Sequence, residues 1–201
     1  MTEAYPPAPW LMHGQLWLSL FRLRTAVDEV RPAGVYGVAL VSYEAPSPLT
    51  YAELLVARPV GKAVSITDIW VDSAASVAGG RELWAIPKGL ADFTHITSRK
   101  GPLTDASWSA ALHGVPVAAA RFRDVSRAMV RTPFKGSTTQ PGLTSGIGAD
   151  QGPKSATLRG SAKVLPALSS WDINPDGPIG WLADQRPLVS FRMADFRMSF
   201  G

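Results

Sequence analysis

The sequence predicts a mainly β fold, either a barrel or a sandwich, with small helical insertions. Many short runs of branched and aromatic residues favour strands, and turns that contain glycine or proline separate these runs. Few segments repeat apolar residues with the 3.6-residue period of a helix. The chain has 201 residues, no internal repeat and no linker-like segment, so we expect one domain over residues 1–201.

The first half of the chain contains four predicted strands, over residues 10–24, 35–43, 51–60 and 63–71. In the first of them Leu16 and its even-numbered neighbours alternate with Trp17 and other apolar residues, which indicates burial on both sides. Residues 25–30 are predicted to form a helical turn. Residues 72–78 are small and polar, and we expect a turn or one helical turn there, before a Gly-Gly pair.

The second half contains six further predicted strands, over residues 91–98, 108–112, 115–122, 129–132, 157–164 and 188–200. Residues 135–153 are rich in glycine, serine, threonine and proline, so we expect an irregular loop, with a lid over a site as the alternative. Residues 179–184 are predicted to form one helical turn. This order of elements supports the mainly β assignment, with helices only as insertions.

The composition argues against several classes of function. The chain lacks cysteine, which excludes disulfides, thiolate zinc sites and thiol nucleophiles. The net charge is +4, and the arginines that cluster between residues 121 and 131 do not interleave with aromatic residues in a stacking pattern, so no nucleic-acid partner is expected. No apolar run approaches the ~20 residues that span a membrane, and no signal-peptide pattern is present. We therefore expect a cytoplasmic protein without a membrane partner.

Common motifs of metal, hydrolase and cofactor chemistry are also missing from the sequence. His13, His95 and His113 are far apart and show no metal-ligand spacing, so no metal site is predicted. The chain has no G-x-S-x-G nucleophile elbow and no dinucleotide-binding glycine pattern. We therefore expect no cofactor.

The most informative stretch surrounds Lys88, which lies among apolar and conformationally restricted residues, after Ile86-Pro87 and before Gly89-Leu90. Burial of an ammonium group is costly unless the group is paired, and a buried lysine often loses its proton instead. A neutral lysine is a nucleophile toward carbonyl carbon. The alternative is a structural lysine whose stem covers apolar surface while its charged end stays in solvent.

Two glutamates are candidates to work with this lysine. Glu53 follows Tyr51 at the start of an apolar strand, and it is interpreted as a surface residue, an ion-pair partner or an acid with a raised pKa. Glu82 lies next to Arg81 and six residues before Lys88. For Glu82 an ion pair with Arg81 is the favoured interpretation.

The residues around Lys88 resemble the signature of the acetoacetate decarboxylase superfamily. Residues 80–88, GRELWAIPK, are similar to the family pattern G-R-E-L-x-[AG]-[FYI]-P-K, which ends on the lysine that forms a Schiff base. Residues 7–20 resemble the family's entry strand, and residues 49–53 resemble a segment that carries an active-site glutamate. Residues 195–201 resemble the terminal strand of a short actinobacterial-type branch. The resemblance implies a closed, cone-like, mainly antiparallel β-barrel with an internal pocket.

The resemblance also implies roles for individual residues. Lys88 would be the Schiff-base lysine, and Glu53 would be a pocket acid that moves protons during the reaction. Arg81 and Glu82 would be structural supports that orient the loop and the barrel. All four residues match the family pattern in type and order.

Two positions depart from the family pattern. The decarboxylases carry a second lysine directly after the reactive one, where this chain has Gly89. They also carry an arginine that addresses the substrate carboxylate, where this chain has Gln15, which is therefore the expected substrate-binding residue of the entry strand. Without a neighbouring cation Lys88 would have to be neutralised by desolvation, to which Trp84 and Ile86 would contribute as substrate-binding walls.

Three classes of function remain open from the sequence. The first is a Schiff-base-forming lyase that acts on a keto acid or a larger carbonyl substrate by decarboxylation or by aldol or dehydration chemistry. The second is a cyclase or isomerase of secondary metabolism in which Lys88 is not covalent. The third is a non-catalytic protein that binds small molecules. Family members tend to assemble through their barrel surfaces, so the resemblance leaves a homo-oligomer open as well.

Overall fold

The computed structural model describes residues 4–125 and 129–201. These residues form eleven strands, an α-helix and a short 3-10 helix. The strands are β1 (Trp10–Leu23), β2 (Gly34–Glu44), β3 (Tyr51–Val60), β4 (Ala63–Val71), β5 (Gly89–Leu90), β6 (Asp92–Lys100), β7 (Leu103–Leu112), β8 (Val115–Val125), β9 (Arg131–Gln140), β10 (Lys154–Ile173) and β11 (Val189–Phe200). The helix α1 covers Ala74–Trp84, and the 3-10 helix η1 covers Gly180–Leu182. The mainly β prediction is confirmed.

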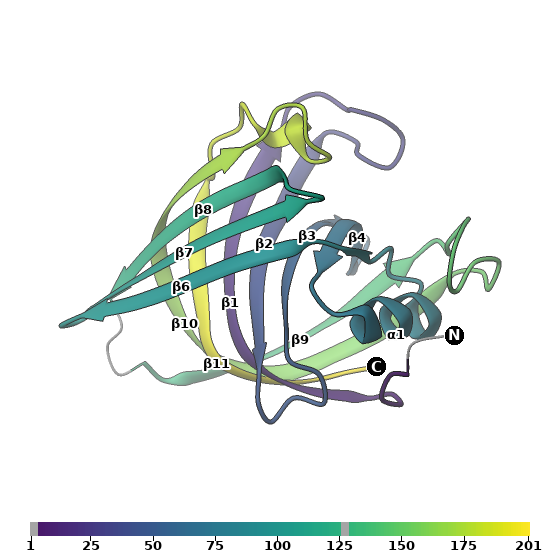
Figure 1. Ribbon diagram of the computed structural model, residues 1–201, viewed down its shortest axis with the longest axis horizontal. Helices are drawn as coiled ribbons and strands as arrows, with labels where there is room; N and C mark the ends of the chain where they lie inside the picture. The colour runs from purple at the N-terminus through teal and green to yellow at the C-terminus, as the bar shows by residue number, and fades with distance from the viewer. Residues whose placement is uncertain (1–3, 126–128) are drawn as a thin grey trace.

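Seven strands close into a ring in the order β11-β1-β2-β3-β4-β9-β10, which is completed by the pairing of β10 with β11 (Figure 1). Neighbouring strands in the ring are antiparallel except at the junction of β4 and β9, where one parallel bridge joins Val64 to Thr138. The strand β10 is long enough to pair with β11 and β9 along one part and with β8 along the other. Strands β8, β7 and β6 continue from it as an outer layer.

The weak junction between β4 and β9 is reinforced by one side chain, that of Gln140. Its amide nitrogen donates to the carbonyl oxygen of Ile66 at 3.1 Å, and its amide oxygen accepts from the backbone N–H of Ile66 at 3.1 Å and from the hydroxyl of Ser65 at 3.0 Å. Gln140 is 1 % exposed. A side-chain amide therefore satisfies the backbone groups that a continuous strand would otherwise pair.

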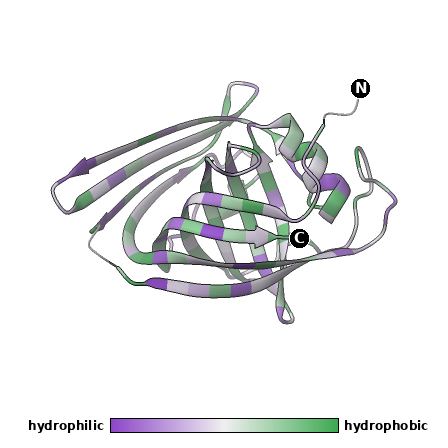
Figure 2. Ribbon diagram, turned by 90° about the horizontal axis from the view of Figure 1, so that it is seen from below, coloured by the Kyte–Doolittle hydropathy of each residue, from purple (hydrophilic) through white to green (hydrophobic). Residues whose placement is uncertain are grey.

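Both faces of the ring are apolar, because each packs on a different partner. On one face β1–β3 contact the outer layer through a cluster that includes Trp17, Phe21 and Trp108. The other face points into the ring, where a second cluster includes Trp10 and Phe196. Figure 1 shows the outer layer crossing β1 and β2, and Figure 2 shows hydrophilic and hydrophobic residues alternating along many of the strands. The two-sided burial predicted for residues 10–24 is therefore present in β1.

The helix α1 is longer than predicted, because the Gly79-Gly80 pair lies inside it rather than after it. The hydroxyl of Ser73 caps the first turn by accepting from the backbone N–H of Ser76 at 3.2 Å. Glycine is needed at both positions for space: a Cβ on Gly79 would lie 2.6 Å from the Trp10 ring, and one on Gly80 would lie 2.7 Å from Cδ of Lys88. Tertiary contacts thus override the low helix propensity of glycine.

Two other local predictions were wrong. Residues 25–30 contain no helical turn and form an irregular connection. Residues 135–140, predicted as part of a loop, belong to β9, whereas 141–153 form the irregular segment that was expected. The helical turn predicted over 179–184 is present as η1. Within 4–125 and 129–201 no helix has the length and apolar character to cross a membrane.

Candidate active site

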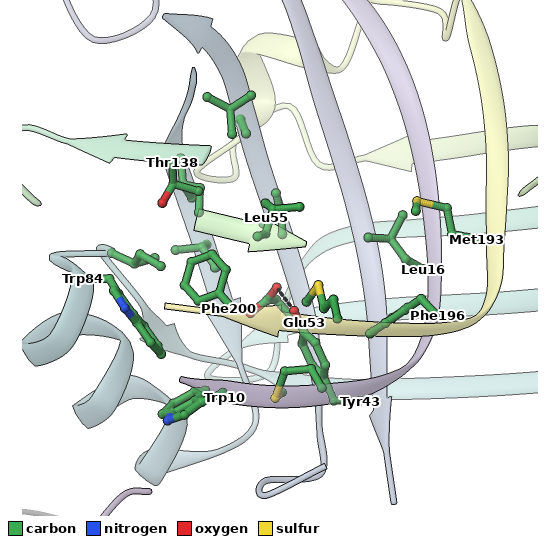
Figure 3. A pocket seen from close by; sticks show the side chains of 18 of the residues that line it. Trp10, Leu16, Tyr43, Glu53, Leu55, Trp84, Thr138, Met193, Phe196 and Phe200 are labelled. Atoms are coloured by element: carbon green, nitrogen blue, oxygen red, sulfur yellow. Dashed lines mark hydrogen bonds between the residues drawn. The ribbon is translucent and has the colours of Figure 1, made fainter. Parts of the chain in front are cut away.

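The interior of the ring contains a cavity of about 400 Å³. Its wall is formed by side chains from the seven ring strands, from the end of α1 and from the segment that follows α1. Aliphatic, aromatic and methionine side chains make up most of the wall, and Figure 3 shows several of them facing one another, among them Trp10, Trp84, Phe196 and Phe200. The cavity is therefore apolar, and a few polar groups project into it, as is usual for a site that binds small molecules.

Lys88 is the central polar group of this cavity, and its side chain is 5 % exposed. Lys88 lies in the short segment between α1 and the two-residue strand β5. Gly89 of β5 pairs in parallel with Trp70 of β4. The lysine Nζ donates three hydrogen bonds: to Oε2 of Glu53 at 2.9 Å, to Oγ of Ser76 at 2.9 Å and to the phenol oxygen of Tyr51 at 3.3 Å. The solvent-exposed alternative for this lysine is therefore excluded.

Glu53 lies on β3 with its side chain in the same cavity wall, and the residue is 2 % exposed. One carboxylate oxygen accepts from Lys88, and the other accepts from the hydroxyl of Tyr43 at 3.1 Å (Figure 3). Burial, and then the charge of Glu53, raise the pKa of the Tyr43 phenol well above its ordinary value. Tyr43 therefore stays protonated and holds the carboxylate toward Lys88. Of the interpretations open for Glu53, the structure selects the buried ion-pair partner.

The protonation state of Lys88 reflects two opposing influences. Burial is the larger single influence and lowers the pKa of the amine. The negative charge of Glu53, aided by Tyr51 and by the hydrogen bonds of both residues, acts in the other direction and leaves the pKa of Lys88 raised overall. Lys88 is therefore an ammonium group at neutral pH, and it is paired with Glu53 at 2.9 Å. This differs from the expectation that apolar surroundings keep the amine neutral.

Two partners of Lys88 were not identified as functional residues from the sequence. Tyr51 lies two residues before Glu53 on the same face of β3, so strand periodicity was a signal that placed the two side chains together. Ser76 lies in the first turn of α1, and its contact with Lys88 depends on a helix whose extent the sequence did not reveal. The N-terminal turn of α1 thus contributes a hydroxyl group to the surroundings of the lysine.

The predicted substrate-binding residues divide into two groups. Trp84 and Ile86 line the cavity, as expected. Gln15 does not, because its neighbour Leu16 occupies the inward position on β1 and the register of β1 shifts between Gly14 and Leu16. The side chain of Gln15 instead donates to Glu44 at 2.9 Å and accepts from Arg192. The prediction that Gln15 contacts a substrate in this cavity is therefore not supported.

The two predicted supporting residues lie at the end of α1. Arg81 donates to the backbone carbonyl oxygens of Ser145 and Ile147, the latter at 3.1 Å, and to that of Lys88 at 3.3 Å. It thereby joins the irregular segment 141–153 to the lysine. The expected ion pair with Glu82 is not among the contacts of the described residues. The backbone carbonyl of Glu82 accepts from Lys154, and its carboxylate raises the pKa of Tyr5 through a hydrogen bond.

A metal centre finds no support in the described part of the chain. Residues 4–125 and 129–201 contain no group of three or more histidine, aspartate or glutamate side chains that could hold a metal ion. The polar groups that line the cavity include the amine of Lys88, the carboxylate of Glu53 and the phenol groups of Tyr43 and Tyr51.

Comparison with known proteins gives one family match. The model of the family described as acetoacetate decarboxylase (ADC) matches residues 27–149, which include Tyr51, Glu53, Ser76 and Lys88. A comparison with curated protein sequences gave no match.

Solved structures share this fold at low sequence identity. The enduracididine biosynthesis enzyme MppR, complexed with pyruvate, is 14 % identical with a TM-score of 0.63, over 99 % of this chain and 90 % of that one. An acetoacetate decarboxylase-like enzyme from Sphingomonas wittichii RW1 is 16 % identical with a TM-score of 0.57, over 97 % and 91 %. An acetoacetate decarboxylase from Legionella pneumophila is 16 % identical with a TM-score of 0.58, over 98 % and 86 %.

Proposed function

The chain belongs to the acetoacetate decarboxylase family, and from this premise we propose that it is an enzyme whose Lys88 forms a Schiff base with a ketone or aldehyde. The observation that carries the proposal is the contact between the buried Lys88 amine and the carboxylate of Glu53, at 2.9 Å in the wall of an apolar cavity. A nucleophile, a proton acceptor and a space for the reacting carbonyl are thus adjacent.

The first step of the proposed reaction is a proton transfer within the pair. The ammonium of Lys88 gives one proton to Glu53, which leaves a neutral amine beside a neutral acid. An apolar substrate that displaces water from the cavity favours this transfer, because desolvation disfavours the charged forms of both groups. Because Gly89 supplies no neighbouring cation to lower the pKa of Lys88, the neutral amine arises here by proton transfer to Glu53.

Schiff-base formation then follows in two steps. The lone pair of Lys88 attacks the carbonyl carbon, and a proton moves from the attacking nitrogen to the carbonyl oxygen, which gives a neutral carbinolamine while Glu53 keeps its proton. Glu53 returns its proton to that hydroxyl group, the carbon–oxygen bond breaks, and one water molecule leaves. The product is an iminium cation that faces the regenerated carboxylate of Glu53, so the site again holds one positive and one negative charge.

The iminium accepts an electron pair from a bond to the neighbouring carbon. That bond can break with loss of carbon dioxide, of an aldehyde fragment or of a proton, so decarboxylation, retro-aldol cleavage and dehydration share one intermediate. Among the solved structures of the same fold, MppR was obtained with pyruvate and with a condensation product of pyruvate and an aldehyde. These ligands support a carbonyl substrate for the present chain, and we place its reaction among the carbon–carbon lyases because of the family to which the chain belongs.

A second candidate function rests on the raised pKa of Lys88. A lysine that keeps its proton stabilises a developing enolate, while Glu53 removes a proton from the substrate. The protein would then be an isomerase or cyclase without a covalent intermediate. This candidate predicts that Lys88 forms no adduct with any carbonyl compound, and a single trapping experiment therefore separates it from the first.

The test is reductive trapping followed by mass spectrometry of the intact protein. The protein is incubated with acetoacetate, pyruvate or acetopyruvate and treated with borohydride, which converts an iminium into a stable secondary amine. We expect an adduct in the wild type and in Lys62→Met, a control at an exposed turn lysine, and a strongly reduced adduct in Lys88→Met. Equal labelling of all three proteins, or no labelling across the panel, contradicts the Schiff-base proposal.

A further inference from the structure

Schiff-base formation at Lys88 requires a proton to move from the attacking nitrogen to the carbonyl oxygen. Both atoms are bonded to the same carbon, so direct transfer passes through a small, strained ring, whereas a bridging hydroxyl group widens the ring and relieves the strain. We propose that the phenol of Tyr51 is this bridging group and hence a catalytic residue, an inference that rests on the proposed function. The phenol gives its proton to the oxygen and takes one from the nitrogen.

Tyr51 lies within reach of both atoms between which the proton moves. Its phenol oxygen is 3.3 Å from Nζ of Lys88, and its side chain lines the cavity. In the carbinolamine the former carbonyl oxygen lies two bonds from Nζ, which is a distance of about 2.4 Å. When that oxygen points to the same side of the lysine as the phenol, the two oxygen atoms come within hydrogen-bond distance of each other.

The other two partners of the lysine amine are less suited to this transfer. Ser76 is 0 % exposed and does not line the cavity, so a substrate in the cavity does not reach its hydroxyl. Glu53 holds the proton that it took from Lys88 and needs it for the later loss of water, and its second oxygen accepts from Tyr43 at 3.1 Å. Tyr51 has the longest of the three contacts with Nζ, at 3.3 Å against 2.9 Å, so a substrate displaces it most easily.

The phenol of Tyr51 carries a proton when the reaction begins. Burial is the largest influence and raises the pKa of Tyr51, the positive charge of Lys88 lowers it, and the negative charge of Glu53 raises it again. The pKa of Tyr51 remains above its ordinary value of 10.0. Proton transfer from Lys88 to Glu53 removes both charges, while burial remains. At neutral pH the phenol therefore has a proton to give.

Two neighbours hold this phenol beside the lysine. The ring of Tyr43 packs against that of Tyr51, with centroids 4.4 Å apart. The hydroxyl oxygen of Ser76 accepts from Nζ of Lys88 at 2.9 Å, and a hydrogen bond from Ser76 lowers the pKa of Tyr51, as a donor to the phenol oxygen does. Ser76 thus connects the nitrogen to the phenol oxygen and is a positioning residue.

The atoms and charges of this step balance. The lone pair of Nζ forms a bond to the carbonyl carbon, and the π electrons move to the oxygen. The oxygen takes the proton of the Tyr51 phenol, and the resulting phenolate takes a proton from the cationic nitrogen. The carbinolamine is neutral, Tyr51 regains its starting form, and Glu53 still holds the proton that the loss of water consumes.

Exchange of the ketone oxygen with water measures this step. Cyclohexanone is incubated with the protein in water enriched in oxygen-18, and mass spectrometry of the ketone follows the label that Schiff-base formation and hydrolysis introduce, after subtraction of the rate without protein. We expect Tyr51→Phe to slow the exchange by about a hundredfold or more and Ser76→Ala to slow it by a smaller factor. Tyr36→Phe removes a phenol that bonds to Pro32 outside the cavity, and it should exchange as the wild type does.

The direction of the effect separates proton transfer from an influence on the charge of Lys88. Tyr51 raises the pKa of Lys88, so its replacement by phenylalanine makes the neutral amine more accessible. Without a role in proton transfer, Tyr51→Phe would therefore exchange as fast as the wild type or faster. Trapping with cyanoborohydride after long incubation tests whether the site is intact, and we expect the Lys88 adduct to form in Tyr51→Phe as well.

Three outcomes would overturn the inference. If Tyr51→Phe exchanges oxygen as fast as the wild type and both proteins form the adduct, the phenol carries no proton, although the Schiff base stands. If Tyr51→Phe is folded by urea denaturation but forms no adduct even after long incubation, the phenol holds the substrate or the lysine instead. If the wild type gives neither exchange nor an adduct, the proposed function fails and the role of Tyr51 fails with it.

Discussion

Replacing Glu53 with glutamine separates the two influences on Lys88. The amide has almost the shape of the carboxylate and still accepts a hydrogen bond, but it carries no charge. The attraction that raises the pKa of Lys88 is then lost, while burial, the largest influence, remains and lowers that pKa. The variant should therefore hold a lysine that deprotonates below its ordinary value of 10.5.

The size of the effect on stability depends on pH. Leaving one partner of a buried ion pair unpaired costs about 3–5 kcal/mol. Removing the proton from an ordinary lysine instead costs about 1.4 kcal/mol for each pH unit below 10.5, which is about 4.8 kcal/mol at pH 7 and about 2 kcal/mol at pH 9. We therefore expect Glu53→Gln to lower the free energy of unfolding by about 3–5 kcal/mol at pH 7 and by only about 2 kcal/mol at pH 9.

The direction of this pH dependence follows from proton linkage. In the variant the unfolded state binds more protons than the folded state between pH 7 and 9, so its stability rises with pH. In the wild type the folded pKa of Lys88 is raised, so the contribution of Lys88 to stability is constant below about pH 10.5. It is lost only as the pH rises through the raised value. The difference between the two proteins must therefore shrink toward pH 9.

Urea denaturation followed by tryptophan fluorescence at pH 7 and pH 9 measures both differences. Glu29→Gln removes an exposed carboxylate and serves as the matched control, with an expected change within about 0.5 kcal/mol. A destabilisation by Glu53→Gln that is the same at both pH values, or that falls below about 1 kcal/mol at pH 7, would refute the account of a buried and coupled ion pair.

Three further substitutions test separate parts of the structure. Gly80→Ala brings a Cβ to 2.7 Å from Cδ of Lys88, so we expect trapping at Lys88 to slow by about tenfold or more, while urea denaturation shows a change within about 1 kcal/mol because alanine favours the helix. Gln140→Leu leaves the N–H and C=O of Ile66 unpaired at the ring junction, and it should lower the free energy of unfolding by about 2–4 kcal/mol in the same assay. Thr138→Val removes an unpaired buried hydroxyl and should raise that free energy by about 1 kcal/mol; a loss of stability would indicate a hidden partner.

Much of the fold was predictable, because strand periodicity and turn residues act locally. Apolar residues on both faces of residues 10–24 predicted a strand that is buried on two sides. In the structure β1 packs against the outer layer with one face and lines the cavity with the other. The family resemblance added two expectations, that the strands close into a barrel and that Lys88 and Glu53 belong to the same site. These features depend on residue type and spacing, which the sequence carries directly.

The predictions that failed depend on contacts between distant segments. Gly79-Gly80 suggests a helix end, yet it lies within α1 because Trp10 and Lys88 need the space that side chains would fill. Residues 135–140 have the composition of a loop, yet they form a strand because β10 offers a partner along their length. Gln15 has the expected place in the sequence, but the register shift beside Gly14 belongs to the pairing of β1 with β11.

The charge state of Lys88 could not be predicted from its neighbours in the sequence either. The apolar neighbours of Lys88 in the sequence predicted desolvation, and burial does lower the pKa of Lys88. The groups that oppose this influence, Glu53 and Tyr51, lie on β3 at sequence separations of 35 and 37 residues. Only the folded chain reveals that Lys88 is paired with Glu53 and that this contact raises the pKa of Lys88 against the effect of burial.

The most direct test of the central claim is a peptide map of reductive trapping at several pH values. The chain has six lysines, so the exposed ones act as internal standards for Lys88. With cyanoborohydride and a ketone, labelling of an exposed lysine such as Lys62 should rise about tenfold per pH unit below its pKa. If Lys88 passes its proton to Glu53, its labelling should dominate at pH 7 and stay nearly constant up to pH 9. Labelling of Lys88 that rises in parallel with Lys62, or that is absent, would contradict the claim.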